Sequence, residues 1–194
     1  FLDKHDLPAL YRIHERPSPE RLDKLRLFLN EIGMSLGGGD EPTPQDYRDL
    51  AEAIKGRDDA DIIQTVMLRS MSQAVYSPHN EGHFGLAYPA YAHFTSPIRR
   101  YPDLLVHRAI RSVIRGPRQT NTVLRAEGAP VEPPTKWCPY TFEQMLELGE
   151  HCSMTERRAD DATRDVEGWL KCEFMSDKLG EVYDGTIASV TQFG

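Results

Sequence analysis

The sequence predicts an α+β fold that is mainly helical and contains only short strands. Apolar residues recur at helical spacing through most of the first 76 residues, and residues 141–174 run without a proline. Between these regions, residues 78–95 are rich in glycine, histidine and aromatic residues, a composition typical of turns and brief strands. We therefore expect helices toward both ends of the chain and short strands in the middle.

Three helices are expected before Pro78. Each has a start signal, a repeating apolar face or a glycine at its exit, and Thr43 is the N-cap candidate of the second. In the third, Met67 and Met71 are interpreted as core residues rather than as a ligand groove. The predicted helices cover residues 18–33, 43–56 and 58–76.

Two short strands are predicted at residues 83–87 and 91–95, and helical spacing resumes after Pro102. A loop rich in proline separates this helix from a long one that begins at Thr141, with Gln144 at the capping-box position. The long helix is expected to span about 50 Å. Its predicted buried side consists of Phe142, Met145, Gly149, Cys152, Ala159, Ala162, Val166, Trp169 and Leu170.

Composition excludes several classes of protein. The chain has 194 residues, 39% of them hydrophobic and 27% charged, with a net charge of −7, which is ordinary for a globular domain. No apolar run is long enough for a membrane span and no signal sequence is recognised, so we expect a cytoplasmic protein. The cysteines, Cys138, Cys152 and Cys172, are too few for a disulfide framework and are expected to be reduced.

One segment is strongly basic within this acidic chain. Residues 93–118 contain six arginines and a single acidic residue, Asp103, for a net charge of +5. Arg108, Arg111 and Arg115 lie off the apolar stripe of the predicted helix, so they are left for solvent or for a ligand. A local basic patch favours a positioned anion site over general polyelectrolyte binding.

The Ser96-Pro97-Ile98-Arg99-Arg100 stretch suits a phosphodiester. Ser96 and Pro97 are a plausible N-cap and first-turn pair, and the start of a helix favours an anion. Arg99 can hold two phosphate oxygens and offset charge that develops at phosphorus. Arg100 must point elsewhere, toward another phosphate or toward a carboxylate such as Asp103. The alternative interpretation is that both arginines only brace structural carboxylates.

Aromatic residues just before this stretch, Tyr91, His93 and Phe94, can stack on bases as in single-strand binders. Two possible metal sites are interpreted differently. His79 and His83 are four residues apart, but Pro78 and Gly82 break a helical zinc motif. Asp160, Asp161 and Asp165 lie among arginines, and solvated ion pairs are the better interpretation. We therefore expect no metal ligands in this chain.

Residues 82–108, GHFGLAYPAYAHFTSPIRRYPDLLVHR, closely resemble the signature of the ribonuclease II superfamily, whose catalytic module is the RNB domain. Residues 151–175 and 180–194 resemble the bacterial ribonuclease R group of that superfamily. The resemblance implies that residues 1–176 form the C-terminal part of an RNB catalytic domain. It further implies that residues 177–194 begin an OB-fold RNA-binding domain of the ribosomal S-one type, and that the chain is part of a longer protein.

The resemblance also implies a function. Members of the superfamily are processive 3′-to-5′ hydrolytic exoribonucleases that release nucleoside 5′-monophosphates, including from structured RNA. Their Mg²⁺ is held by aspartates that would precede residue 1, so this chain is expected to be inactive alone. The match to the SPIRR turn gives Arg99 a catalytic role, and we predict that Ser96, Arg100, Tyr91 and His93 bind RNA or its phosphates.

The resemblance makes RNA the expected partner of a monomer, with stalled-translation machinery as a further partner. Two alternatives stay open at this point. One is a non-catalytic RNA-binding or regulatory module that keeps the arginine turn without metals. The other is a structural interaction domain whose arginines pair with carboxylates.

Overall fold

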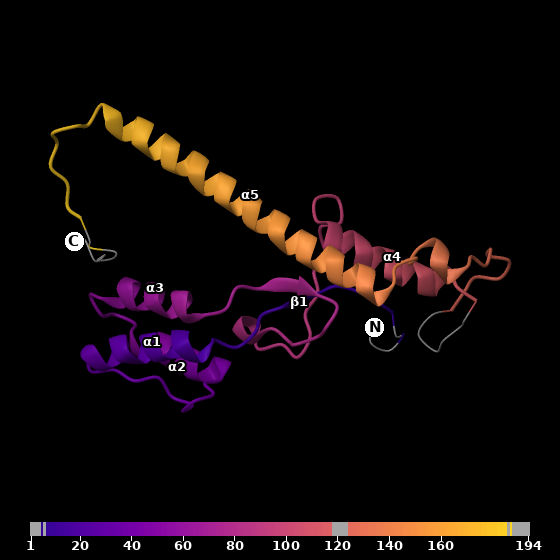
Figure 1. Ribbon diagram of the computed structural model, residues 1–194, viewed down its shortest axis with the longest axis horizontal. Coiled ribbons are helices and arrows are strands. Elements are labelled where there is room, and N and C mark those ends of the chain that lie inside the picture. The colour runs from indigo at the N-terminus through magenta and orange to yellow at the C-terminus, as the bar shows by residue number, and fades with distance from the viewer. Residues whose placement is uncertain (1–4, 6, 118–123, 186, 188–194) are drawn as a thin grey trace.

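Figure 1 shows the computed structural model of the chain, which describes residues 5, 7–117, 124–185 and 187. About half of these residues lie in helices, and the strands form one two-stranded sheet, so the mainly helical α+β prediction is confirmed. The elements in chain order are β1 (Tyr11–Ile13), α1 (Pro19–Glu31), α2 (Pro44–Ala53), α3 (Ala60–Ser70), β2 (Val75–Ser77), the 3-10 turn η2 (Phe84–Leu86), α4 (Tyr101–Arg115), the 3-10 turn η3 (Pro134–Lys136) and α5 (Phe142–Ser176).

Helices α1, α2 and α3 pack into a cluster through their apolar faces. Thr43 caps α2 as predicted, and the Asp46 carboxylate accepts a hydrogen bond from the Thr43 backbone N–H at 2.7 Å. Phe84 of η2 also packs into this core, so the cluster anchors one end of the segment that leads to Arg99. The buried residues of the core are Leu22, Leu25, Leu29, Leu36, Tyr47, Leu50, Ile54, Ile63, Met67 and Phe84.

The third helix ends earlier than predicted. α3 stops at Ser70, the backbone becomes extended at Met71, and residues 75–77 form β2 instead of continuing the helix. β2 pairs antiparallel with β1, with Arg12 opposite Tyr76. Strands of three residues are too short for a period-two pattern to be visible in the sequence.

The strands predicted at residues 83–87 and 91–95 are not formed. Residues 84–86 form η2, and Ala87 follows in the left-handed conformation with φ 56°, which interrupts an extended chain. His83 makes only isolated bridges, to His14 and Tyr88. The prediction was wrong because glycine and aromatic residues in this segment serve a tight turn rather than a pleated ladder.

His14, at the end of β1, fastens this turn. Its Nδ1 accepts a hydrogen bond from the Gly85 N–H at 2.9 Å, and its backbone carbonyl accepts one from the Phe84 N–H at 2.8 Å. A Cβ on Gly85 would lie 2.7 Å from the same Nδ1 atom, so the backbone approaches His14 too closely for any residue other than glycine at this position. β1 therefore fixes where the GHFGLAYP segment starts.

α4 begins at Tyr101, later than the Ser96-Pro97 pair implies. Arg100 is its N-cap residue and Pro102 lies in its first turn. Residues 96–100 form a separate turn, in which the Ser96 carbonyl accepts hydrogen bonds from the N–H groups of Arg99 at 3.2 Å and Arg100 at 3.0 Å. The prediction that Ser96 caps the helix was wrong, so Ser96 does not lie at the positive end of the helix dipole.

α5 packs its first third against β2. The Tyr76 N–H donates to Ser153 Oγ at 2.9 Å, and that hydroxyl donates to the Gly149 carbonyl at 2.7 Å. These contacts cover the free edge of the sheet. The capping box predicted at Thr141 and Gln144 is also present, so the start of this helix is as expected.

The second half of α5 contacts little of the described chain. Residues 157–176 are exposed, and Figure 1 shows this half of the helix lying apart from the other helices and the strands. Among the described residues, no helix is both long and apolar enough to cross a membrane. Met145, Gly149 and Cys152 are buried as predicted, but the exposed part of the predicted buried side comprises Phe142, Ala159, Ala162, Val166, Trp169 and Leu170.

The chain after α5 has no regular structure in residues 181–185. Of the predicted start of an OB-fold at residues 177–194, residues 186 and 188–194 lie outside the described residues. The division into domains at residue 176 therefore stays a prediction.

Candidate nucleic-acid interface around Arg99

The adjacent arginines of the SPIRR turn have different surroundings. Asp103, fully buried in the first turn of α4, accepts hydrogen bonds from the Arg100 guanidinium at 2.8 Å and from the Ser96 N–H at 2.7 Å. The Arg99 side chain is exposed and has no hydrogen-bond or ion-pair partner within the described part of the chain. Of the pair, Arg99 is the residue available to an anion.

Arg99 lies at a cavity of about 450 Å³ between the SPIRR turn, β2 and α5. Both arginines of the turn contribute to one side of it, and carboxylates from α5 contribute to another. The lining residues are Tyr76, Arg99, Arg100, Tyr101, Pro102, Cys152, Thr155, Glu156, Ala159 and Asp160. The cavity is therefore polar, with cationic groups from the SPIRR turn in one wall and anionic groups from α5 in another.

Glu156 in this wall is paired with Arg12 of β1. Arg12 Nη1 lies 2.6 Å from Glu156 Oε2, and the Arg12 guanidinium also lies over the Tyr76 ring, 4.6 Å from its centroid. This pairing offsets the Glu156 charge that would otherwise repel a phosphate. It also fixes α5 against the sheet beside Arg99.

Tyr76 connects this ion pair to His93. Its hydroxyl lies 2.9 Å from His93 Nδ1 and 3.4 Å from Glu156 Oε1. Burial, and then the nearby Glu156 carboxylate, raise the pKa of Tyr76 to about 12, so the phenol keeps its proton at neutral pH. Tyr76 can therefore act as a hydrogen-bond donor in the wall of the cavity.

His93 is held in its neutral form near neutral pH. Burial lowers its pKa below the ordinary 6.5, and the positive charges of Arg100 and Arg12 lower it further. The Nδ1 atom of a neutral imidazole can accept a hydrogen bond from the Tyr76 hydroxyl. His93 thus acts in this structure as a partner of Tyr76 rather than as a cation for phosphate.

The predicted RNA-binding residues do not all reach the cavity. Arg99 and Arg100 line it, whereas Ser96, Tyr91 and His93 are absent from its lining. The Tyr91 ring makes edge contacts with His83 and His93, at centroid distances of 5.4 Å and 5.6 Å. Tyr91 and His93 thus form an aromatic layer on the segment that leads into the turn.

Phe94 has a different partner from this layer. Its ring is stacked on His107 of α4, with centroids 4.4 Å apart and planes 2° from parallel. The ring is nevertheless 45% exposed. Its free side therefore remains open to a base.

The sequence left the arginines of α4 for solvent or for a ligand, and Arg111 is indeed exposed. Residues 124–140 nevertheless supply a contact for each of the three, which the sequence did not predict. Contacts between segments so distant in sequence leave no local spacing signal. The contacts are Arg108 with the Tyr140 hydroxyl, Arg111 over the Trp137 ring at 3.9 Å, and Arg115 with Glu132 at 3.9 Å. Arg118 lies outside the described residues.

The described residues do not fit a metal site. Among them, no group of three or more His, Cys, Asp or Glu side chains is placed to hold an ion. Asp161 pairs with Arg164 on the exposed face of α5. His79 packs edge-on against Phe142 with centroids 4.9 Å apart, and His83 Nδ1 accepts a hydrogen bond from the Leu86 N–H.

Sequence reasoning missed Arg12, Tyr76 and Glu156 as parts of this site. Tyr76 was assigned to a helix, and Arg12 and Glu156 are 144 residues apart in sequence. Only the pairing of Arg100 with Asp103 had a local signal, because the first turn of a helix places residues three apart side by side. That pairing is confirmed.

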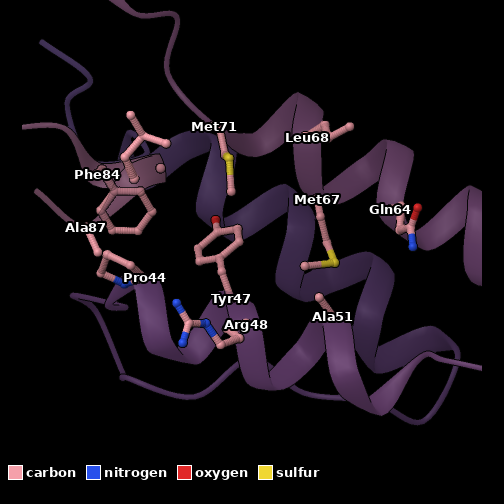
Figure 2. A pocket seen from close by; sticks show the side chains of 12 residues that line it. Pro44, Tyr47, Arg48, Ala51, Gln64, Met67, Leu68, Met71, Phe84 and Ala87 are labelled. Atoms are coloured by element: carbon pink, nitrogen blue, oxygen red, sulfur yellow. The ribbon is translucent and has the colours of Figure 1, made fainter. Parts of the chain in front are cut away.

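A second cavity, of about 350 Å³, lies in the helical cluster between α2, α3 and η2 (Figure 2). Its lining is mainly apolar, with Arg48 and Gln64 as polar members, and the Tyr47 hydroxyl is already bonded to Ser70 at 2.9 Å. Met67 is buried as predicted, although it and Met71 also face this cavity. The lining provides apolar packing rather than a recognisable set of ligand-binding groups.

The chain belongs to the RNB domain family, whose sequence model matches residues 1–116. It is 52% identical to ribonuclease R of Escherichia coli strain K12 and 55% identical to ribonuclease R of Vibrio parahaemolyticus, over 196 and 199 residues. These alignments cover 100% of this chain and 23% and 22% of the relatives. The chain thus spans about a quarter of the length of these curated relatives.

Solved structures show the same fold. Mycoplasma genitalium RNase R, in complex with ribose-methylated single-stranded RNA, matches with a TM-score of 0.82 and 25% identity, over 100% of this chain and 28% of that one. Yeast Ssd1, described as a pseudonuclease, matches with a TM-score of 0.58 and 24% identity, over 78% of this chain and 17% of that one. The match to Ssd1 concerns the fold alone.

Proposed function

We propose that this chain is the arginine-bearing part of a hydrolytic 3′-to-5′ exoribonuclease that degrades RNA processively to nucleoside 5′-monophosphates, including from structured RNA. The observation that carries the proposal is the exposed guanidinium of Arg99, which lies at a polar cavity and has no partner among the described residues. The 52% identity to ribonuclease R of Escherichia coli supports it.

Arg99 suits the chemistry of a phosphodiester. A guanidinium is permanently charged and can donate parallel hydrogen bonds to two phosphate oxygens. Because Arg99 has no carboxylate partner among the described residues, its charge is not already offset. In a displacement at phosphorus it would stabilise negative charge that builds up on the nonbridging oxygens.

The other residues of the interface have supporting roles in this proposal. Arg100 keeps guanidinium donors that Asp103 does not use, so it can contact a neighbouring phosphate. Ser96 shapes the turn, and Tyr91 and His93 offer ring surfaces to bases on the approach to the cavity. Tyr76 links His93 and Glu156 through its hydroxyl.

We further propose that Mg²⁺ serves the intact enzyme through ligands elsewhere in the full-length protein, since the described residues do not fit a site for it. This chain alone is then expected to be inactive. RNA as the partner is supported by the RNA complex of Mycoplasma genitalium RNase R. Family resemblance is the basis for a cytoplasmic location, a monomeric state and contact with stalled-translation machinery.

A digestion assay tests the proposed function. An oligoribonucleotide labelled at its 3′ end is incubated with Mg²⁺ and with one of three proteins: the 194-residue chain, the full-length protein, or the full-length protein carrying Arg99→Ala. The full-length protein alone should release labelled monophosphate rapidly. Activity of the isolated chain would show that a metal site exists within it, contrary to the proposal.

A second candidate is a non-catalytic RNA-binding module. The observation in its favour is that the described residues combine an exposed Arg99 with no group of side chains placed to hold a metal ion. A full-length protein that binds the oligoribonucleotide in Mg²⁺ but releases no monophosphate would favour this candidate.

A further inference from the structure

We propose that Asp103 is a positioning residue for Arg99: it fixes the turn from which Arg99 projects, and it acts on the reaction only through that guanidinium. This inference rests on the proposed function and deepens it. It gives the buried carboxylate of the basic segment a task in the reaction, although Asp103 does not line the cavity.

The hydrogen bonds form a continuous path from Asp103 to Arg99. Asp103 Oδ1 accepts from the Ser96 N–H at 2.7 Å, which holds the start of the turn against α4. The Ser96 carbonyl in turn accepts from the Arg99 N–H at 3.2 Å and from the Arg100 N–H at 3.0 Å. The backbone on both sides of the Arg99 side chain is therefore tied to one buried carboxylate.

Asp103 also separates the roles of the two arginines. Its Oδ1 takes a guanidinium hydrogen bond from Arg100 at 2.8 Å, and 24% of the Arg100 side chain remains exposed. Arg100 is thus tied to α4, whereas Arg99, which lines the cavity beside it, has no such tie among the described residues. Without the carboxylate, Arg100 would be free to compete with Arg99 for the same phosphate.

The energetics favour a functional reason for this arrangement. Asp103 is fully buried, and its Oδ2 and the Arg100 Nε are buried without hydrogen-bond partners among the described residues. Burying an ion pair with unsatisfied atoms costs free energy that an apolar residue would avoid. A residue retained only for stability at this position would be expected to be better satisfied.

A double-mutant cycle in the full-length protein tests the proposal. The variants are Asp103→Asn, Arg99→Ala and the two combined, with Asp49→Asn on the exposed face of α2 as the matched control. Turnover and KM are measured with single-stranded RNA and Mg²⁺. Asp103→Asn keeps an oxygen acceptor at nearly the same shape but removes the charge that holds Arg100.

The expected result is non-additive. Asp103→Asn should lower turnover roughly tenfold or more and leave KM within about twofold, while adding no further loss in the Arg99→Ala background. The control should behave as wild type. Losses that multiply in the combined variant, or a normal turnover for Asp103→Asn, would overturn the proposal. A wild-type protein that releases no monophosphate would instead contradict the proposed function itself.

Folding is checked separately, since Asp103 is buried. Thermal melting is measured for every variant. A second double-mutant cycle replaces Asp103→Asn with Arg100→Gln, which breaks the same ion pair at a partly exposed side chain. Its effect on turnover should likewise disappear in the Arg99→Ala background. Amide hydrogen exchange at Ser96 should be faster in Asp103→Ala, which removes the acceptor of the Ser96 N–H, and unchanged exchange there would contradict the hydrogen-bond path.

Discussion

Arg12 and Glu156 are joined by an ion pair with an Nη1 to Oε2 distance of 2.6 Å, although 144 residues separate them in sequence. The pair connects β1 to the middle of α5, and the Arg12 guanidinium lies over the ring of Tyr76 between them. One wall of the Arg99 cavity therefore depends on a contact between β1 and the middle of α5.

Replacing Glu156 with glutamine should weaken the contact between β1 and α5. Because the pair is partly buried and hydrogen-bonded, with side-chain exposures of 15% and 33%, the free energy of unfolding should fall by about 1–2 kcal/mol. The pKa of Tyr76 should also fall, since Glu156 contributes to raising it. Urea unfolding and ultraviolet titration of the phenol measure these effects. Glu150→Gln, at an exposed position on α5, is the matched control, and an equal effect there would remove the explanation.

Arg99→Ala should act on the chemical step. In the full-length protein we expect turnover to fall on the order of 10² to 10³, with a smaller effect on RNA binding, as for a group that contacts the transition state. Single-turnover cleavage and equilibrium binding separate these quantities. Arg115→Ala removes an arginine already paired with Glu132 and should change neither greatly. Weakened binding at normal turnover would make Arg99 a binding residue only.

Two glycines of α5 should respond in opposite ways to alanine. A Cβ on Gly149 would lie 2.7 Å from the Tyr76 carbonyl oxygen, so Gly149→Ala must push the helix away from β2 and destabilise the protein. A Cβ on Gly168 would meet nothing within 4 Å, so Gly168→Ala should stabilise the exposed helix by about 0.5–1 kcal/mol. Thermal melting of both variants checks the pair, and a stable Gly149→Ala protein would show that α5 and β2 are less closely packed.

Stability should decline in mildly acidic solution. His83 and His93 both have a pKa below the ordinary 6.5 in the folded protein, chiefly because of burial. Below pH 6.5 the unfolded chain therefore binds protons that the folded chain resists. Their contribution is fully present above that pH and is lost as the pH falls through the lowered pKa values. Urea unfolding between pH 7.5 and 5 measures the decline, and His93→Asn should reduce it.

The sequence predicted those elements whose signals are local. Thr43 and Thr141 mark the starts of α2 and α5 because a cap and its partner lie three residues apart. β1 and β2 were missed because each strand is three residues long and its partner is far along the chain. The second half of α5 has apolar residues at helical spacing, and the sequence therefore predicted a buried face. The structure leaves that face exposed, because helical spacing alone does not show whether another element packs against it.

The same distinction applies to the site. Arg99 and the pairing of Arg100 with Asp103 could be predicted, since both lie within one short stretch. Tyr76 and Glu156 could not, because they enter the cavity from β2 and α5. The position of Ser96 was misjudged because the same dipeptide can cap a helix or open a separate turn.

The continuity of α5 has a rotational consequence. It is an uninterrupted helix of 35 residues, and each residue of an α-helix turns the chain by about 100° and advances it by about 1.5 Å. Inserting a single alanine in its exposed half would therefore swing everything after Ser176 to another side of the Arg99 cavity, whereas four alanines would nearly restore the original direction. If α5 sets the direction from which RNA approaches Arg99, activity should depend on the angle through which the insertion rotates the following chain, and not on the number of residues inserted.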